Sequence, residues 1–184
     1  NGLWTEKFSE KPITGRVYIK FGEKDNLKKV YFGNLLNGKK EGRWTIWYKN
    51  GKKKSEETWK DGNQDGLMTE WNENGQKVGE IHFKDGKYDG LLTSWYESGK
   101  KKGEVIYKDG KEHGLMTYWY QNGKKEVETT WKDGRRDGLV TNWYENGQKS
   151  GEGTKKGIKY NGLVTTWYEN GDKSSEVTYK SGKE

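Results

Sequence analysis

The segment GLVTTWYENGDK, residues 162 to 173, decides the fold because close copies of it stand upstream. The chain reads GLVTNWYENGQK from Gly138 to Lys149 and GLMTYWYQNGKK from Gly114. Glycines at positions 42, 66, 90, 114, 138 and 162 open six units with a strict period of 24 residues. Stacked units of this kind bury together the apolar surface that a single unit cannot bury alone. The sequence therefore predicts a repeat array.

The composition indicates an ordered but thin structure. Only 28% of the 184 residues are hydrophobic and 34% are charged, whereas ordinary globular domains are roughly 45–50% apolar. The chain nevertheless carries 10 Trp, 12 Tyr and 4 Phe, and disordered chains are poor in aromatic residues. The chain contains no Cys, which excludes disulfides and cysteine-based metal sites. A thick globular core is not expected.

Two turn signals, Asn-Gly and Asp-Gly, divide each unit. Examples are Asn146-Gly147 and Asp133-Gly134. Both dipeptides favour β-hairpins because type I′ turns need positive φ at both central residues. The segments between the turns are rich in Thr, Val, Ile, Trp and Tyr and show no 3.6-residue period. We therefore predict an all-β fold, an elongated twisted antiparallel sheet of successive β-hairpins with two strands per unit.

The N-terminal region departs from this pattern. Gly15-Arg-Val-Tyr18 is predicted to open a strand and Asn37-Gly38 to form a turn, but the distance from Gly15 to Gly42 is 27 residues. Terminal repeats are commonly atypical because they end the array. We therefore divide the chain into a degenerate cap at residues 1–41 and one elongated domain of six repeats at 42–184, the last of them truncated.

Side-chain alternation predicts which residues share a face. A two-residue turn at Asn146-Gly147 would place Trp143 opposite Ser150 and Thr141 opposite Glu152. This register is preferred because it pairs the Thr of each unit with a Glu, and the two can form a hydrogen bond across the strands. The tryptophans of successive units then form one row.

The other face of the sheet gathers Val140, Tyr144 and the aromatic residues of the second strands. A glycine bulge in the turn would instead bring these aromatics to the face of the tryptophans. The second-strand aromatics are Trp59, Phe83, Tyr107, Trp131 and Tyr179. One unit departs from the pattern. Its turn glycine, Gly157, stands one residue before the position that the 24-residue period predicts, and Lys155 occupies the aromatic position. A bulge or a local weakness is expected there.

The aromatic rows are the candidate binding residues. The tryptophan row consists of Trp47, Trp71, Trp95, Trp119, Trp143 and Trp167, and the adjoining tyrosines are Tyr48, Tyr96, Tyr120, Tyr144 and Tyr168. Packing that holds a single-layer sheet together is the alternative role for these rings. If one row faces solvent, it offers stacking surfaces to an extended peptide, a partner protein or a polysaccharide.

The repeat unit resembles the MORN repeat (membrane occupation and recognition nexus) in its variant form, in particular the bacterial YwqK-like group of antitoxin-type proteins. The similarity covers residues 42–184 and rests on the pattern G-L-x-T-x-W-Y-E-N-G-x-K…E…Y-K-D-G-K-x-D-G, as in Gly90 to Gly114. The Glu10-Lys-Pro-Ile-Thr-Gly15 segment resembles the lead-in to such arrays. The resemblance implies a sheet of hairpins with a binding or scaffolding role.

No catalytic constellation is visible. His82 and His113 occupy different repeat positions and are expected to be exposed strand or turn residues. The Glu at the same position of each repeat is interpreted as structural, because an active site is usually singular. The segment from Asp61 to Gly66 fits the first half of a calcium loop, but Asn72 stands where the closing acidic ligand is needed. We predict no enzyme activity, no metal site and no cofactor.

The charge pattern bears on partners. With 35 basic and 28 acidic residues the net charge is +7, but the two signs alternate in every unit, which is typical of a soluble surface more than of a phosphate track. Nucleic acid is therefore not expected as a partner, and an anionic membrane surface is only weakly supported. Unpaired sheet ends allow self-association. A protein partner, either a toxin or a surface protein, is favoured, with a polysaccharide as the alternative.

The function predicted from the sequence is non-enzymatic presentation of a rigid β surface to another protein, with antitoxin-like neutralisation as its specific form. The alternative is a glycan-binding module that uses the aromatic rows. No signal peptide and no apolar run of about 18 residues is visible, but the chain begins at Asn1 without Met. A bacterial protein is expected, cytoplasmic as an antitoxin, or periplasmic or on the cell surface if a leader was removed.

Overall fold

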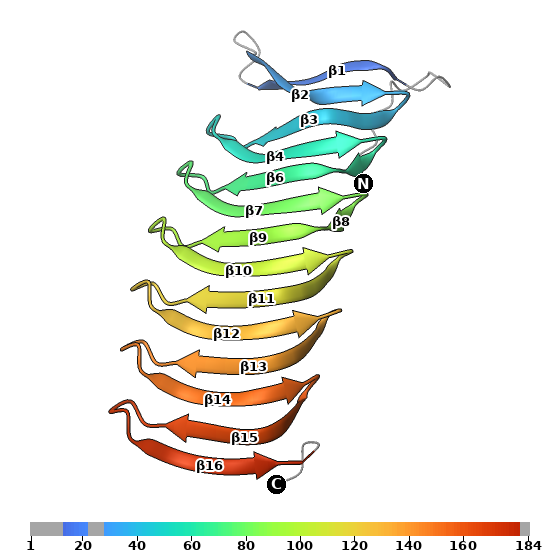
Figure 1. Ribbon diagram of the computed structural model, residues 1–184. Helices are drawn as coiled ribbons and strands as arrows, with labels where there is room; N and C mark the ends of the chain where they lie inside the picture. Colours follow the sequence, from blue (N-terminus) through green and yellow to red (C-terminus); the bar gives the residue numbers. More distant parts are fainter. Residues whose placement is uncertain (1–12, 22–27, 181–184) are drawn as a thin grey trace.

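The protein is a single open antiparallel sheet of successive hairpins (Figure 1). The computed structural model describes residues 13–21 and 28–180. In Figure 1 the strands stack in chain order along one axis, from β1 at the top to β16 at the bottom. The predicted all-β array is confirmed. No helix in the described ranges has the length and apolarity to cross a membrane.

Apart from the short strands β5 and β8, each strand pairs with the strands before and after it in the chain. Their bounds are β1 Gly15–Phe21, β2 Lys28–Leu36, β3 Lys39–Trp47, β4 Lys53–Lys60, β5 Asn63–Gln64, β6 Gly66–Trp71, β7 Lys77–Lys84, β8 Lys87–Tyr88, β9 Gly90–Trp95, β10 Lys101–Lys108, β11 Lys111–Trp119, β12 Lys125–Lys132, β13 Arg135–Trp143, β14 Lys149–Lys156, β15 Lys159–Trp167 and β16 Lys173–Tyr179. The short strands β5 and β8 pair with β4 and β7.

The described part of the N-terminal region agrees with two local predictions. Strand β1 begins at Gly15. Asn37 and Gly38 have φ of 50° and 77° and connect the paired residues Leu36 and Lys39, as expected for a two-residue turn. Residues 1–12 and 22–27 of the predicted cap lie outside the described residues, as do 10–12 of the proposed lead-in and the last four residues of the chain.

The Asp-Gly turns are the tight turns that the sequence predicts. Asp133 and Gly134 both have positive φ, 51° and 78°, and they join the paired residues Lys132 and Arg135. Four such turns place an Asp at positive φ, which Asp tolerates better than most residues. The Gly134 amide also donates a hydrogen bond of 2.9 Å to the carbonyl of Glu112, at the start of β11 just after the preceding turn. Turns of successive repeats are therefore joined along this edge.

The Asn-Gly connections are longer than predicted. The amide of Tyr144 donates to the carbonyl of Gln148 over 2.8 Å, and the amide of Gly147 donates to the carbonyl of Tyr144 over 2.8 Å. Only the glycine has positive φ, 91° for Gly147. These bonds close a three-residue loop, the kind of hairpin connection in which a type I turn precedes a left-handed glycine.

A β-bulge follows each of these loops and restores the register. Trp143 pairs with Lys149, but Thr141 pairs with Glu152, so that Ser150 is the additional residue of the bulge. The predicted placement of Trp143 opposite Ser150 is therefore wrong, because the loop takes up one more residue than a two-residue turn. The predicted pairing of Thr141 with Glu152 is confirmed, because the bulge shifts the register back.

The three-residue loop and the β-bulge together determine which face of the sheet each residue occupies. Trp131 lies two residues from Thr129, which pairs with Met116, so both share the face of that methionine. Thr117 and Trp119 point to the opposite face, since alternation separates them from their neighbour Met116. The second-strand aromatics thus lie opposite the tryptophan row, as the preferred register predicted, and the alternative in which they join the tryptophans is wrong.

Both faces of the single sheet contribute to the core. On one face a central row is buried to 9% exposure or less at Trp44, Ile81, Val105, Met116 and Val140. On the other face the threonines of the repeats are equally buried at positions 45, 69, 93, 117, 141 and 165. The stack of neighbouring strands, instead of a second layer, therefore excludes water from the middle of each strand.

The irregular unit near Gly157 keeps the common architecture. Gly157 and Ile158 form the turn between the paired residues Lys156 and Lys159, and Lys155 pairs with Tyr160. The register shift beside this turn recurs at the equivalent place in the hairpins of β10 and β12. The predicted bulge is therefore confirmed by the register shift between Gly153 and Lys155, although it is not specific to this unit. A glycine with φ of 67° at the first turn position replaces the Asp of the other turns.

Candidate interaction surfaces

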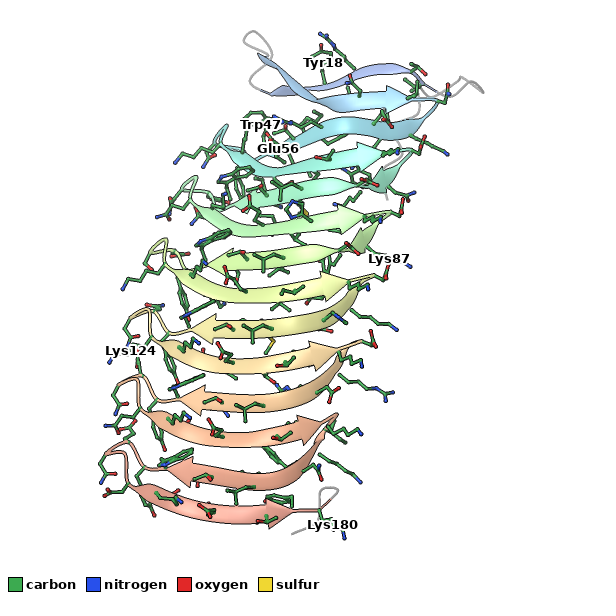
Figure 2. All side chains as sticks on the ribbon, in the orientation of Figure 1. Tyr18, Trp47, Glu56, Lys87, Lys124 and Lys180 are labelled. Atoms are coloured by element: carbon green, nitrogen blue, oxygen red, sulfur yellow. The ribbon has the colours of Figure 1, made fainter. Side chains whose placement is uncertain are left out.

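The tryptophan face is the face that carries the Trp, Thr and Leu of each first strand and the Glu and Lys of each second strand. Its lateral limits are the Asn-Gly loops, where Lys124 lies, and the Asp-Gly turns, where Lys87 lies (Figure 2). Thr117 donates a hydrogen bond of 3.4 Å to Glu128 across the strands. Equivalent bonds join Thr69 to Glu80 and Thr141 to Glu152. The predicted Thr–Glu ladder is confirmed at these positions.

Lysines cover the indole rings of this face. Lys125 and Glu128 are three residues apart, a spacing that places residues on opposite faces of a regular strand, but the bulge between them lets them form an ion pair. The Lys125 ammonium also lies 5.6 Å from the ring centroid of Trp143 in the next repeat, within the range of a cation–π contact. The same contact recurs at 5.4–5.9 Å over Trp71, Trp95, Trp119 and Trp167.

The six predicted tryptophans are therefore brought together on one face, and lysines contact five of them. Their indoles are all half-buried, and the lysine stems cover ring surface that would otherwise face water. Exposed ion pairs and cation–π contacts are each worth roughly 0–1 kcal/mol, so it is their repetition along the array that matters.

The predicted tyrosines also join one repeat to the next. The hydroxyl of Tyr120 donates a hydrogen bond of 2.7 Å to the carbonyl of Trp143. Tyr48, Tyr96 and Tyr144 make the same bond to Trp71, Trp119 and Trp167. Burial raises the pKa of Tyr96 and Tyr120, and the nearby Glu126 and Glu145 raise it further. Tyr168, in the last repeat, is 59% exposed.

A row of exposed leucines is the feature that the sequence reasoning missed. Leu67, Leu91, Leu115, Leu139 and Leu163 are exposed by 38–51%, one in each repeat. Ile106, paired with Leu91, extends the row and is 39% exposed. We call these six residues the leucine stripe. The Leu after the first Gly of each unit is visible in the sequence. The alternation of side chains along a strand assigns this Leu to a face, but it does not show that the neighbouring rings leave the Leu exposed.

An aromatic cluster lies on the opposite face. The ring of Tyr88 contacts those of Phe83 and Tyr107 edge-on, with centroids 4.9 and 5.2 Å apart. Burial raises the pKa of Tyr107, and Glu112 is the next cause. A hollow of about 520 Å³ lies beside this cluster and is also lined by Gln64 and Met68. Tyr88 keeps 40% of its surface exposed.

The residues weighed for chemistry lie at separate places in the sheet, His82 in β7, His113 in β11 and Asp61 in the turn after β4. His82 is exposed, as predicted, whereas His113 is half-buried, with its Nδ1 3.6 Å from a carboxylate oxygen of Asp133. Asp61 and Gly62 form an ordinary positive-φ turn. No group of three or more potential metal ligands occurs within residues 13–21 and 28–180.

These surfaces and the stacked hairpins define a β-repeat protein with two extended faces. The family model described as MORN repeat variant matches the chain six times, at residues 40–61, 64–85, 88–109, 112–133, 136–154 and 160–181. These matches cover more than half of the chain, which therefore belongs to the MORN repeat variant family. No curated protein matches the chain.

Proposed function

We propose that this protein is a non-enzymatic repeat protein that binds another protein through the leucine stripe on its tryptophan face. The observation that carries this proposal is the exposure of one Leu per repeat, by 38–51%, beside tryptophans that lysines cover. Isolated exposed leucines are normal on protein surfaces, but an exposed apolar residue repeated along one face is typical of an interaction site. The stripe is a regular row on successive hairpins of one sheet. Ile106 extends it beside Leu91. The residues paired with the other leucines are polar, as Thr130 is opposite Leu115.

The geometry favours an elongated partner surface. Consecutive leucines are separated by two strands, roughly 9–10 Å at the usual strand spacing. A partner that presents apolar side chains at that interval would bury several leucines at once. Half-exposed leucines have roughly 1 kcal/mol each to gain from burial, so specific binding requires several of them together. Multiple contacts on a preformed sheet need little ordering of the protein itself.

Charge patterning supports a protein partner over a polyanion. Each Glu of the tryptophan face is bound to a Lys three residues before it, as in the pair of Lys77 and Glu80 at 3.2 Å. Alternating charges of both signs flank the stripe, and such rims contribute specificity more than affinity. Antitoxin-like neutralisation is the specific form that we propose, in which the sheet covers the active surface of a toxic protein.

Variants of the stripe test this proposal. A triple variant, L91Q/L115Q/L139Q, removes three central members, while L36Q/I158Q removes exposed apolar side chains that lie outside it. Proteins captured from the source organism by the wild type are compared with those captured by both variants, and direct binding of each purified candidate is then measured by calorimetry. We expect a partner whose Kd rises at least tenfold for the triple variant only. Equal binding of every captured protein to all three forms would contradict the proposal.

Glycan binding is the second candidate and would use the aromatic cluster. The hollow beside Phe83 and Tyr88 combines ring edges with the amide of Gln64, and sugars are bound by rings together with polar side chains. This candidate predicts a periplasmic or cell-surface location. Affinity electrophoresis in gels that contain polysaccharides tests it. Retardation of the wild type but not of Y88A supports glycan binding, and equal mobility of both in every gel argues against it.

A further inference from the structure

A basic hollow lies at the turn edge where β13, β14 and β15 meet. Its volume is about 610 Å³, and its lining includes Trp131 and five cations, namely Arg135, Arg136, Lys155, Lys156 and Lys159. Carboxylates are absent from this lining. Asp133 and Asp137 instead line an adjoining hollow of about 490 Å³, which shares Arg135 and Arg136 with this one.

The cations of this hollow differ from the lysines of the tryptophan face. There, each Lys near the loop edge is held by a Glu of its own strand, as Lys149 is by Glu152. Within the described ranges, none of the five cations of the hollow makes an ion pair with a carboxylate. The positive charge gathered here is therefore not held in ion pairs, which favours an anionic ligand.

Three residues at this place differ in charge from their equivalents in the preceding repeat. Arg136 stands one period after Glu112, and Lys155 stands one period after Trp131, in the aromatic position of the second strand. Gly157 takes the turn position that Asp133 occupies one period earlier. Each change removes a negative charge or adds a positive one, and together they make this hollow different from its equivalents. The repeat itself does not require them, because the sheet keeps its register here.

The lining also holds more hydrogen-bond donors than its side chains satisfy. The Arg136 guanidinium lies 5.4 Å from the centroid of the Trp131 ring, and the Lys155 ammonium lies 4.6 Å from that of Tyr160. The Nε of Arg136 and the Nε1 of Trp131 are buried without a hydrogen-bond partner, an arrangement that costs free energy unless an acceptor is supplied. Burial lowers the pKa of Lys155, and nearby Arg136 lowers it further.

We propose that this hollow is a binding site for a tetrahedral oxyanion, the phosphate or sulfate group of a soluble small molecule. A guanidinium presents a planar fork of N–H donors that matches such oxygens in pairs, and neighbouring ammonium groups add point charges. The Arg136 fork and the Lys155 ammonium lie on neighbouring strands of the same hollow. The anion would supply the acceptors and the negative charge that the lining lacks. This site is independent of the leucine stripe.

Titration of the whole chain with inorganic phosphate, sulfate and acetate at constant ionic strength tests the site. We expect saturable amide shifts in ¹H–¹⁵N NMR spectra for phosphate or sulfate, largest at Gly134, Gly157 and Ile158. Acetate is expected to bind at least fivefold more weakly. Shifts that do not saturate, that are equal for acetate, or that spread evenly over the turns of all repeats would overturn the proposal.

A matched pair of variants adds a second test. R136E/K155Y restores the acidic and aromatic character that Glu112 and Tyr107 have in the preceding repeats, whereas K60Q/K84E makes the same change in net charge away from the hollow. We expect phosphate affinity to fall at least tenfold in R136E/K155Y and to change less than twofold in the control. Equal losses in both variants would show general charge attraction and overturn the site. If R136E/K155Y does not give the circular dichroism of the wild type, R136Q replaces it under the same criteria.

Discussion

The hydroxyl of Tyr120 donates a hydrogen bond of 2.7 Å to the carbonyl oxygen of Trp143, 23 residues further along the chain. The bond joins the loop of one hairpin to the strand end of the next and uses a carbonyl at the point where strand pairing is interrupted by the bulge. Neighbouring repeats are therefore connected by a side-chain hydrogen bond as well as by the backbone hydrogen bonds between paired strands. This matters in a single-layer sheet, where each repeat is stabilised only by its neighbours.

Removal of this hydroxyl should weaken the coupling between repeats. We expect Tyr120→Phe to lower the free energy of unfolding by about 1 kcal/mol, the usual net value of a hydrogen bond, because the Trp143 carbonyl loses its partner. Tyr168→Phe is the matched control, since Tyr168 is 59% exposed in the last repeat. Urea denaturation followed by circular dichroism measures both. Equal stability of Y120F and Y168F would show that the bond contributes nothing.

Glycines at one repeat position should differ in their tolerance of a methyl group. A Cβ at Gly103 would lie 2.5 Å from Cε1 of Tyr118, whereas a Cβ at Gly151 would meet only ordinary contacts of 3.8 Å or more. We expect Gly103→Ala to destabilise the protein by about 1–3 kcal/mol through displacement of the ring. Gly151→Ala is expected to stay within about 0.5 kcal/mol of the wild type or to gain slightly, since alanine restricts the unfolded chain. Thermal unfolding of the two variants distinguishes these outcomes.

The contrast between Gly103 and Gly151 also shows what the sequence can predict. The 24-residue period and the alternation of side chains were enough to derive the hairpins and the pairing of Thr141 with Glu152. The three-residue loops and the bulges were not predicted individually, because their two shifts of register cancel within each hairpin. Some contacts occur in one repeat only, such as that of Tyr118 over Gly103. They depend on side chains that differ between repeats, so a pattern common to all repeats does not predict them.

For the candidate surfaces, too, the sequence predicted the positions of residues but not their contacts. The positions of the Trp and Tyr rows followed from periodicity, but their partners did not, because the lysines and carbonyls that cover them belong to the next repeat. The departure at Lys155 was visible in the sequence, yet its proximity to Arg136 depends on pairing between neighbouring hairpins. Exposure of Leu115 likewise follows from what its neighbours leave uncovered.

A buried hydroxyl offers a stabilising substitution. Thr129 is only 1% exposed, and its Oγ1 has no hydrogen-bond partner, whereas Val105 occupies the equivalent position one repeat earlier. We expect Thr129→Val to raise the free energy of unfolding by about 1 kcal/mol, because burial of an unpaired hydroxyl is costly. Thr117→Val is the control and is expected to lower the free energy of unfolding, since Thr117 donates a hydrogen bond to Glu128. Chemical denaturation of both variants measures whether the free energy of unfolding rises in T129V and falls in T117V. A loss of stability in T129V would show that the hydroxyl finds an acceptor.

Lys40 should make the stability of the first repeat depend on pH. Its ammonium lies 4.0 Å from the ring centroid of Trp59 and 4.7 Å from that of Trp44. Burial lowers the pKa of Lys40 below its ordinary 10.5, and the nearby Glu57 carboxylate opposes this by raising it. Between the lowered pKa and 10.5 the unfolded chain binds more protons than the folded chain, so this contribution to stability increases as the pH rises.

A comparison of the wild type with Lys40→Met isolates this effect, because methionine keeps an apolar stem over the rings and does not titrate. We expect the wild type to gain stability relative to K40M as the pH is raised from 7 towards 10.5, with thermal midpoints as the measurement. The raised pKa values of Tyr96 and Tyr120 act equally in both proteins, so they cancel in the difference. In Glu57→Gln the rise should begin at lower pH, because the opposing carboxylate is gone. A constant difference between wild type and K40M across this range would show that Lys40 is solvated as fully in the folded chain as in the unfolded one.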